Sequence, residues 1–96
     1  MFIVVWTFRL KDGVSEEEFL VANERMQTEF VYQQPGSVRR TTARGADGEW
    51  LVIGLWGSQE EAAEAGKRAQ TDEVSRTANA MVDPASVSVK RFETLD

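Results

Sequence analysis

The sequence contains neither cysteine nor histidine among its 96 residues. The absence of cysteine excludes disulfide bonds, thiolate nucleophiles and thiolate metal ligands. The absence of histidine excludes imidazole acid–base catalysis, imidazole-bound zinc or iron, and Ser-His or Cys-His nucleophile pairs. Carboxylates remain, but the clusters Glu16–Glu18 and Glu60–Glu64 begin predicted helices, where negative charge stabilises the helix dipole. We therefore expect no metal site there, and no residue stands out as a general base.

Positive charge and long hydrophobic runs are also scarce. The net charge of −5 repels a phosphate backbone, so we expect no nucleic-acid partner. The apolar segment at residues 2–10 is too short to span a membrane, and it lacks the basic flank and cleavage site of a signal peptide. We therefore expect no membrane partner and a cytoplasmic location. Hydrophobic residues make up 42% and charged residues 28%, so we predict one globular domain at residues 1–96.

Local signals divide the chain into strands and helices. Asp47-Gly48 between two extended runs predicts a hairpin. Ser15 and Ser58, each followed by Glu three residues later, predict helix starts in which each side chain bonds an amide of the first turn. In chain order, the predicted elements are a strand at 2–10 buried on both faces, a helix from Ser15 to about Gln33, strands at 37–44 and 50–56, a helix at 59–69, a shorter helix beginning at Thr71 or Asp72, and a strand at 86–93.

The order β-α-β-β-α-β predicts an α+β protein of the ferredoxin-like class with an antiparallel sheet. Two helices cover one face of such a sheet, so the other face should be polar in a monomer. Here both faces carry large apolar residues. Trp6, Trp50, Val52 and Trp56 share one face, and Ile3, Val5, Leu51, Ile53 and Leu55 share the other. Because a two-fold dimer would bury the second set, we predict a homodimer through this apolar sheet face.

The helix predicted at 59–69 can turn only small residues toward the sheet. These are Ala62, Ala63, Ala65, Gly66 and Ala69. A helix with such a face either packs very close to its sheet or leaves room beside large side chains.

The first strand, the long helix ending in Pro35-Gly36, and the segment GEWLVIGLWGSQEEA at 48–62 resemble the dimeric α+β barrel superfamily. Within it the chain is most similar to the antibiotic biosynthesis monooxygenase (ABM) family. The resemblance covers nearly the whole chain and includes Trp56, followed by Ser58 and a helix. It implies a dimer whose sheets pair into a barrel, with a pocket between sheet and helices in each subunit. Because several members oxygenate aromatic polyketides there without a cofactor, it implies a cofactor-independent monooxygenase for a small aromatic or polyketide-type compound.

A related group in the superfamily binds and degrades heme, and the sequence departs from it at two places. Heme-degrading relatives carry an Asn on the first strand, where this chain has Trp6. They also carry an iron-ligating His on the later helix, where this chain has Ala78 or Asn79. Since the chain has no histidine, these departures argue against heme degradation.

Trp56, Asn79 and Arg76 are the catalytic candidates. The indole N–H of Trp56 can donate a hydrogen bond to an oxyanion formed when an electron-rich substrate loses a proton. Alternatively, Trp56 fills the gap beside the alanine-rich helix with its N–H bonded to backbone. Asn79 and Arg76 lie on the short helix, where they either build the pocket wall or lie on the surface, with Arg76 paired to Asp72 or Glu73.

Trp6, Asn23, Tyr32, Met26 and Val52 are the substrate-binding candidates. Trp6 either lines the pocket or belongs to the core or its rim. Asn23 lies near the inward stripe of the first helix, so it either points into the pocket or lies in solvent on the flank of the helix. Tyr32, the single tyrosine of the chain, either closes the pocket or caps the barrel.

Arg39, Arg40 and Arg44 lie on the polar strand at 37–44. We interpret them as protection of a sheet edge and as partners for the acidic helices of a second subunit, rather than as an anion site. A second class of function also stays open, a non-catalytic dimeric module that binds a small ligand or supports other enzymes. An open cavity that reaches Trp56 with convergent polar groups favours the enzyme, whereas a fully packed interior favours the module.

Overall fold

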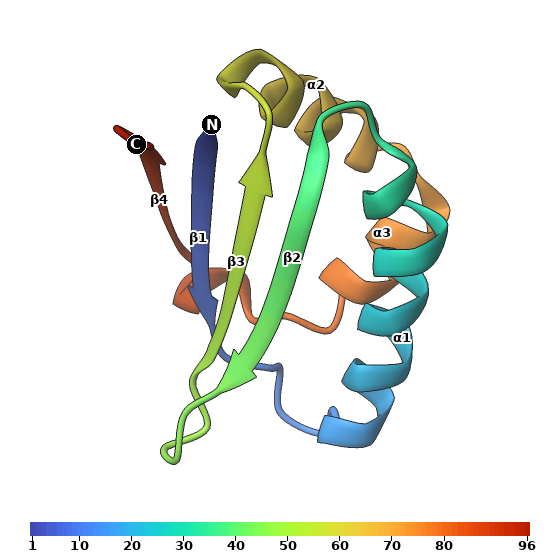
Figure 1. Cartoon of the computed structure of the whole chain (residues 1–96). Coiled ribbons are helices and arrows are strands. Elements are labelled where there is room, and N and C mark those ends of the chain that lie inside the picture. The colour runs from blue at the N-terminus through green and yellow to red at the C-terminus, as the bar shows by residue number, and fades with distance from the viewer.

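The computed structural model describes residues 1–96 (Figure 1). The elements in chain order are β1 (Phe2–Phe8), α1 (Glu16–Glu29), a 3-10 helix (Val31–Gln33), β2 (Ser37–Arg44), β3 (Trp50–Trp56), α2 (Gln59–Ala69), α3 (Glu73–Asn79), a second 3-10 helix (Pro84–Ser86) and β4 (Ser88–Glu93). The strands form one antiparallel sheet in the order β2-β3-β1-β4, and the α-helices lie on one side of it (Figure 1). The predicted α+β, ferredoxin-like fold is confirmed, with the second helical segment divided into α2 and α3.

Side-chain caps fix the first turn of each α-helix. The hydroxyl of Ser15 accepts a hydrogen bond from the amide of Glu18 at 3.0 Å, and that of Ser58 accepts one from the amide of Glu61 at 3.2 Å. The two carboxylates accept hydrogen bonds from these hydroxyls instead of from backbone amides. The predicted helix starts are therefore correct, but the reciprocal half of each capping box is replaced. Asp72 caps α3 with its side chain in the same way.

Three element ends differ from the sequence prediction. The α-helical part of the first helix ends at Glu29, and the chain tightens into the 3-10 helix that ends at Gln33. β1 ends at Phe8 because the amide of Arg9 bonds to the hydroxyl of Ser86 at 2.8 Å, not to a neighbouring strand. β4 begins two residues later than predicted because the second 3-10 helix precedes it.

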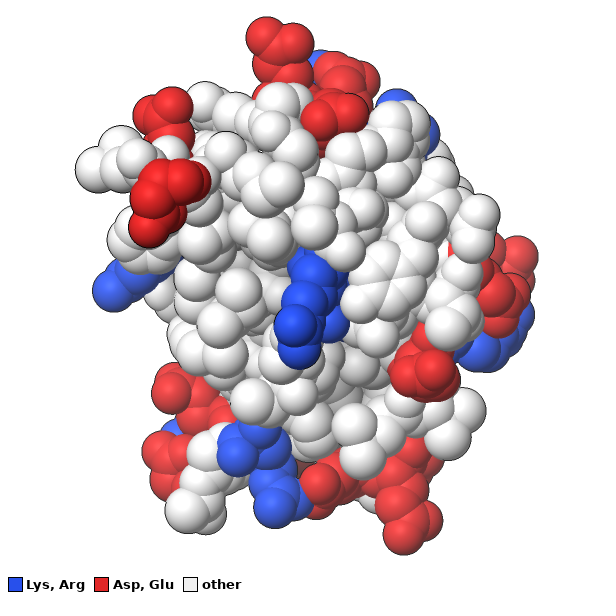
Figure 2. Space-filling model, viewed as in Figure 1, with Lys and Arg blue, Asp and Glu red and all other residues white.

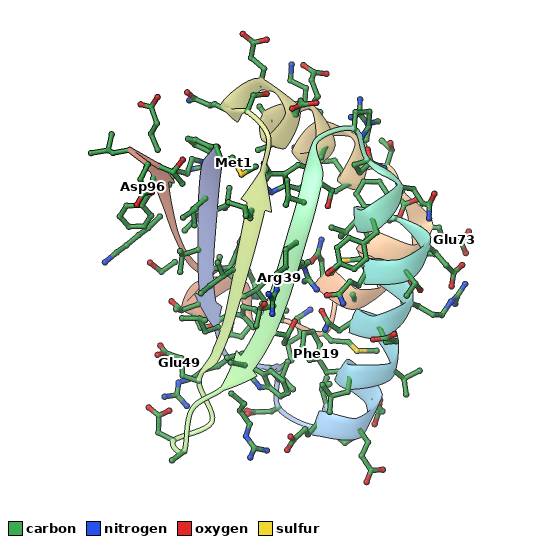
Figure 3. The ribbon with its side chains drawn as sticks, viewed as in Figure 1. Met1, Phe19, Arg39, Glu49, Glu73 and Asp96 are labelled. Carbon is green, nitrogen blue, oxygen red and sulfur yellow. The ribbon has the colours of Figure 1, made fainter.

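The core is built on the helix-facing side of the sheet. Phe19 points from α1 toward the sheet (Figure 3) and meets the rings of Phe8 and Trp50 edge-on, at centroid distances of 5.6 and 5.0 Å. A second group of buried residues joins α1 to the 3-10 helix and α3; it consists of Ala22, Met26, Phe30, Val31 and Ala78. Burial of these groups fixes α1 and α3 against each other, and most of these side chains also border the cavity described below.

The sheet face turned away from the helices carries an apolar surface that we call the outer-face patch. It consists of Ile3, Val5, Leu51, Ile53, Leu55 and Phe92. Ile53 is 38% and Phe92 50% exposed in the single chain, so this face of the sheet is only partly buried without a second subunit. Figure 2 shows a largely uncharged surface with a basic group at its centre, where Figure 3 labels Arg39. None of the helices has the length and apolar character needed to cross a membrane.

Candidate functional site

A cavity of about 1160 Å³ lies between the inner face of the sheet and the helices. β1, β2 and β3 line it from the sheet side, and α1, α2 and α3 line it from the helix side. Its volume lies slightly above the range of about 300–1,000 Å³ that is typical of small-molecule sites. Hydrophobic residues make up 16 of the 29 lining residues, so the cavity suits a ligand with a partly apolar body.

The small residues of α2 create this space. Ala62, Ala65, Gly66 and Ala69 all line the cavity, which answers the question that the sequence left open about this helix. At Gly66 an added Cβ atom would meet no other atom within 4 Å. The helix therefore leaves room beside the large side chains of the sheet instead of packing close to it.

Trp56 is the last residue of β3 and forms part of the cavity wall. Its side chain folds over Gly54 on the same face of the strand, so that a Cβ atom at position 54 would lie 3.1 Å from the indole nitrogen. The indole N–H makes no hydrogen bond within the chain, which removes the alternative of an N–H bonded to backbone. The donor is thus free to bind a ligand atom in the cavity.

Three of the predicted substrate-binding residues, Trp6, Met26 and Val52, also line the cavity. Trp6 pairs with Val52 in β3 and with Val89 in β4, and 41% of its surface is exposed although it lies on the helix-facing side of the sheet. Met26 and Val52 are buried. The exposed tryptophan therefore marks an opening of the cavity, and the two buried residues lie deeper in it.

α3 contributes polar groups to the cavity. Arg76 and Asn79 line it, both are exposed, and neither side chain makes a hydrogen bond or ion pair within the chain, so the predicted alternative pairing of Arg76 with Asp72 or Glu73 is absent. Ser75 is fully buried, lines the cavity, and has a hydroxyl without any hydrogen-bond partner. An unpaired buried hydroxyl is rare and costly in proteins, and because the Ser75 oxygen has no accessible surface, a ligand in the cavity does not reach it in this conformation.

Arg40, Asn23 and Tyr32 lie differently from what the sequence led us to expect. Arg40 was expected at an exposed edge, but its side chain turns inward, where Nη1 donates hydrogen bonds to the amide oxygens of Asn23 at 2.8 Å and Gln27 at 3.1 Å. Asn23 is buried, donates to Thr42 at 3.1 Å, and is not part of the cavity wall. Tyr32 is also outside the wall, since its hydroxyl bonds the backbone of Arg40. Desolvation by the surrounding protein lowers the pKa of Arg40 to about 10.

The charged residues that line the cavity are mainly basic. They are Arg39, Arg40, Arg76 and Glu73, but Arg39 pairs with Leu55 and so turns its side chain to the outer face of the sheet. Arg40 and Arg76 against the carboxylate of Glu73 give a formal charge of +1 at the cavity in a chain of net charge −5. Figure 3 places Glu73 on the side of the helical layer away from the sheet. The cavity therefore combines an apolar wall with a local excess of positive charge, opposite in sign to the protein as a whole.

The sequence analysis did not place Arg40 or Ser75 at the cavity. Strand periodicity held a signal for Arg40, because Arg40 pairs with Gly54 in β3 and thus shares the face that Val52 and Trp56 turn toward the helices. For Ser75 no sequence signal exists, because a serine in the first turn of a helix is commonly solvated and its burial depends on how α3 packs.

Neither a protein-family model nor a curated protein matches the sequence. Solved structures do match in fold. SnoaB, a cofactor-independent oxygenase from Streptomyces nogalater, is similar over 99% of this chain and 93% of its own, with a TM-score of 0.80 and 20% identity. A proposed antibiotic biosynthesis monooxygenase from Bordetella bronchiseptica covers 98% and 96%, with a TM-score of 0.79 and 10% identity. One from Nitrosomonas europaea covers all of both chains, with a TM-score of 0.70 and 17% identity. The chain therefore has the fold of the ABM proteins, as the sequence resemblance indicated.

Proposed function

We propose that the chain is a cofactor-independent monooxygenase that acts on a small aromatic, polyketide-type compound bound in the cavity. The observation that carries this proposal is a cavity that reaches Trp56, whose indole N–H is free to bind a ligand. Arg76 and Asn79, the other two catalytic candidates, line the same cavity with unpaired side chains. The fold shared with a cofactor-independent oxygenase supports the same class of reaction.

In the proposed reaction, a methylene group between two aromatic rings, as in an anthrone, is oxidised to a ketone. The substrate loses a proton and forms a delocalised anion, and this anion transfers an electron to O2. The resulting radical pair joins into a hydroperoxide, which then loses water. The balance is R–CH2–R + O2 → R–CO–R + H2O. One oxygen atom enters the substrate, the other leaves as water, and the substrate supplies all the electrons, so no external reductant is needed.

The residues of the cavity act on the first step by stabilising the anion. The N–H of Trp56 and the side chains of Arg76 and Asn79 are hydrogen-bond donors, which lower the pKa of a substrate whose negative charge rests on an oxygen atom. Because Glu73 is the single carboxylate at the cavity and lies away from the sheet, we assign no general base, and the proton leaves to solvent. The apolar wall limits the access of water to the reactive intermediates.

Oxygen uptake with an anthrone, without added flavin or metal, tests the proposal. Wild type should consume O2 well above the uncatalysed rate, and Trp56→Phe, which keeps an aromatic ring but removes the N–H donor, should lose about 10²-fold or more, as oxyanion donors typically do. Trp50→Phe is the matched control, since Trp50 is a buried core residue outside the cavity wall. Equal rates for wild type and Trp56→Phe would refute the role of the indole N–H.

A second candidate function is a non-catalytic module that binds a small ligand, and the lack of a histidine and of an inward carboxylate in the cavity favours it. Both functions share the ligand cavity and differ in oxygen consumption. Tight binding of anthrone-type compounds without oxygen uptake by any of them would favour the module over the oxygenase.

We further propose that the protein forms a homodimer through the outer-face patch. The patch is apolar, partly exposed in the single chain, and lies on the sheet face that carries no helix. Packing of two such faces around a two-fold axis would remove the patch from water and create a closed barrel of two sheets.

A further inference from the structure

Arg40 is a largely buried cation that has no anionic partner in the chain. Its Nη1 group donates to the side-chain oxygens of Asn23 and Gln27, and its backbone bonds the hydroxyl of Tyr32. All of these partners are neutral. None of the four ion pairs in the chain involves Arg40. A buried charge normally pairs with an opposite charge, so this arrangement calls for an explanation.

The contrast with Arg44 shows what α1 offers to the two arginines. Arg40 and Arg44 lie on the same face of β2, four residues apart, and both reach toward α1. Arg44 meets the carboxylate of Glu16 and forms an ion pair with it. Arg40 meets only the amides of Asn23 and Gln27. α1 thus neutralises one arginine and holds the other in place without neutralising it.

Part of the Arg40 guanidinium remains unpaired, in a residue that lines the cavity. Arg40 lines the cavity, and two hydrogen bonds fix its Nη1 atom, while the Nε and Nη2 groups donate no hydrogen bond within the chain. A guanidinium edge held in this way can bind a carboxylate with two parallel hydrogen bonds. Burial lowers the pKa of Arg40 to about 10, so the side chain remains charged at neutral pH.

We propose that Arg40 is an anion-binding subsite of the cavity, and that the natural ligand carries a carboxylate at one end of an apolar, ring-shaped body. The inference rests on the cavity that the proposed function uses, and it specifies the substrate class. The carboxylate is separate from the reacting carbon: it stays charged throughout, and it orients the ring system by pairing with Arg40. Because Arg40 itself is largely buried, this pairing is stronger than one at the surface.

Isothermal titration calorimetry at pH 7 with two matched probes tests the subsite. Anthracene-2-carboxylate carries the charge, and anthracene-2-carboxamide has nearly the same shape without it. Wild type should bind the carboxylate about tenfold more tightly or better, and Arg40→Gln should lose this preference. Arg44→Gln is the matched control, because Arg44 is already paired with Glu16, and it should keep the preference. Equal affinity of wild type for the two probes, or an unchanged preference in Arg40→Gln, overturns the proposal.

A second variant keeps the proposal testable if Arg40→Gln fails to fold. Asn23→Asp keeps Arg40 and its hydrogen bond but places a carboxylate at the atom that now accepts that bond at 2.8 Å. The carboxylate created by this change then neutralises the guanidinium of Arg40. The preference for anthracene-2-carboxylate over the carboxamide should therefore fall at least as far as in Arg40→Gln. A folded Asn23→Asp protein that retains the full preference overturns the proposal. A preference for the carboxylate probe without oxygen uptake would support the Arg40 subsite and refute the proposed oxygenase. Oxygen uptake without a preference for the carboxylate probe would support the oxygenase and refute the subsite.

Discussion

The hydroxyl of Ser75 gives a prediction in which stability changes and ligand binding does not. Ser75 is fully buried on α3, and its hydroxyl has no hydrogen-bond partner in the chain. Burial of an unpaired hydroxyl costs about 1–3 kcal/mol, and Ala also exceeds Ser in helix propensity by roughly 0.5 kcal/mol. We therefore expect Ser75→Ala to raise the free energy of unfolding by about 1–2 kcal/mol. For a domain of this size, 1 kcal/mol corresponds to a rise in Tm of about 4–8 °C.

The same change should leave ligand binding unchanged. The Ser75 oxygen has no accessible surface, so a ligand in the cavity makes no hydrogen bond with it unless α3 moves. Urea unfolding measures the first effect, and calorimetric titration with anthracene-2-carboxylate measures the second. A loss of affinity in Ser75→Ala would show that α3 moves when a ligand binds.

Ser86→Ala is the matched control for the stability measurement. The Ser86 hydroxyl accepts from the amide of Arg9 at 2.8 Å and donates to the carbonyl of Asp83 at 2.7 Å, so its removal should destabilise the protein by about 1 kcal/mol or more. If Ser75→Ala were destabilising like Ser86→Ala, the Ser75 hydroxyl would have to be bonded in solution, and the reasoning from its unpaired state would be refuted.

The remaining predictions concern the dimer and the charge of Arg40. Ile53→Asp should give monomers or aggregates by light scattering, because it places a charge in the outer-face patch. Val21→Asp, on the exposed side of α1, is the control and should leave the dimer intact. A stable Ile53→Asp dimer would contradict the proposed interface. Burial lowers the pKa of Arg40 to about 10, so the protonated form disappears as the pH rises through that value. The preference for anthracene-2-carboxylate over the amide should therefore hold at pH 8 and decline above about pH 10, and a preference unchanged at pH 11 would contradict this assignment.

The parts of the fold that depend on local signals could be predicted from the sequence. The hairpin strands at 37–44 and 50–56 and the helix at 59–69 have the predicted bounds, because the Asp47-Gly48 turn and the Ser58 cap determine them within a few residues. The ends of β1 and β4 were less accurate, since they depend on a contact between Arg9 and Ser86, 77 residues apart.

The site was harder to predict because it depends on how distant elements pack. The sequence indicated that Trp56 faces the helices, and the register of β3 agrees. Whether its indole N–H is hydrogen-bonded, however, depends on which groups the fold places beside it. Arg40 was expected to protect a sheet edge and to pair with the acidic helices of a second subunit, because it lies on a polar strand. Its burial arises from the position of α1, whose Asn23 and Gln27 meet it. Sequence periodicity indicates which face of the sheet a residue lies on, and the packing of distant elements decides whether that face is exposed to solvent.

The most direct test of the central claim is the fate of labelled oxygen. Purified protein, free of flavin and metal, should convert an anthrone under 18O2 into a ketone that carries one labelled atom by mass spectrometry, with the second atom released as labelled water. Trp56→Phe should slow this conversion by about 10²-fold or more. Product that carries no label under 18O2, or product formed no faster than without protein, would contradict the account of this cavity as the site of a cofactor-independent oxygenation.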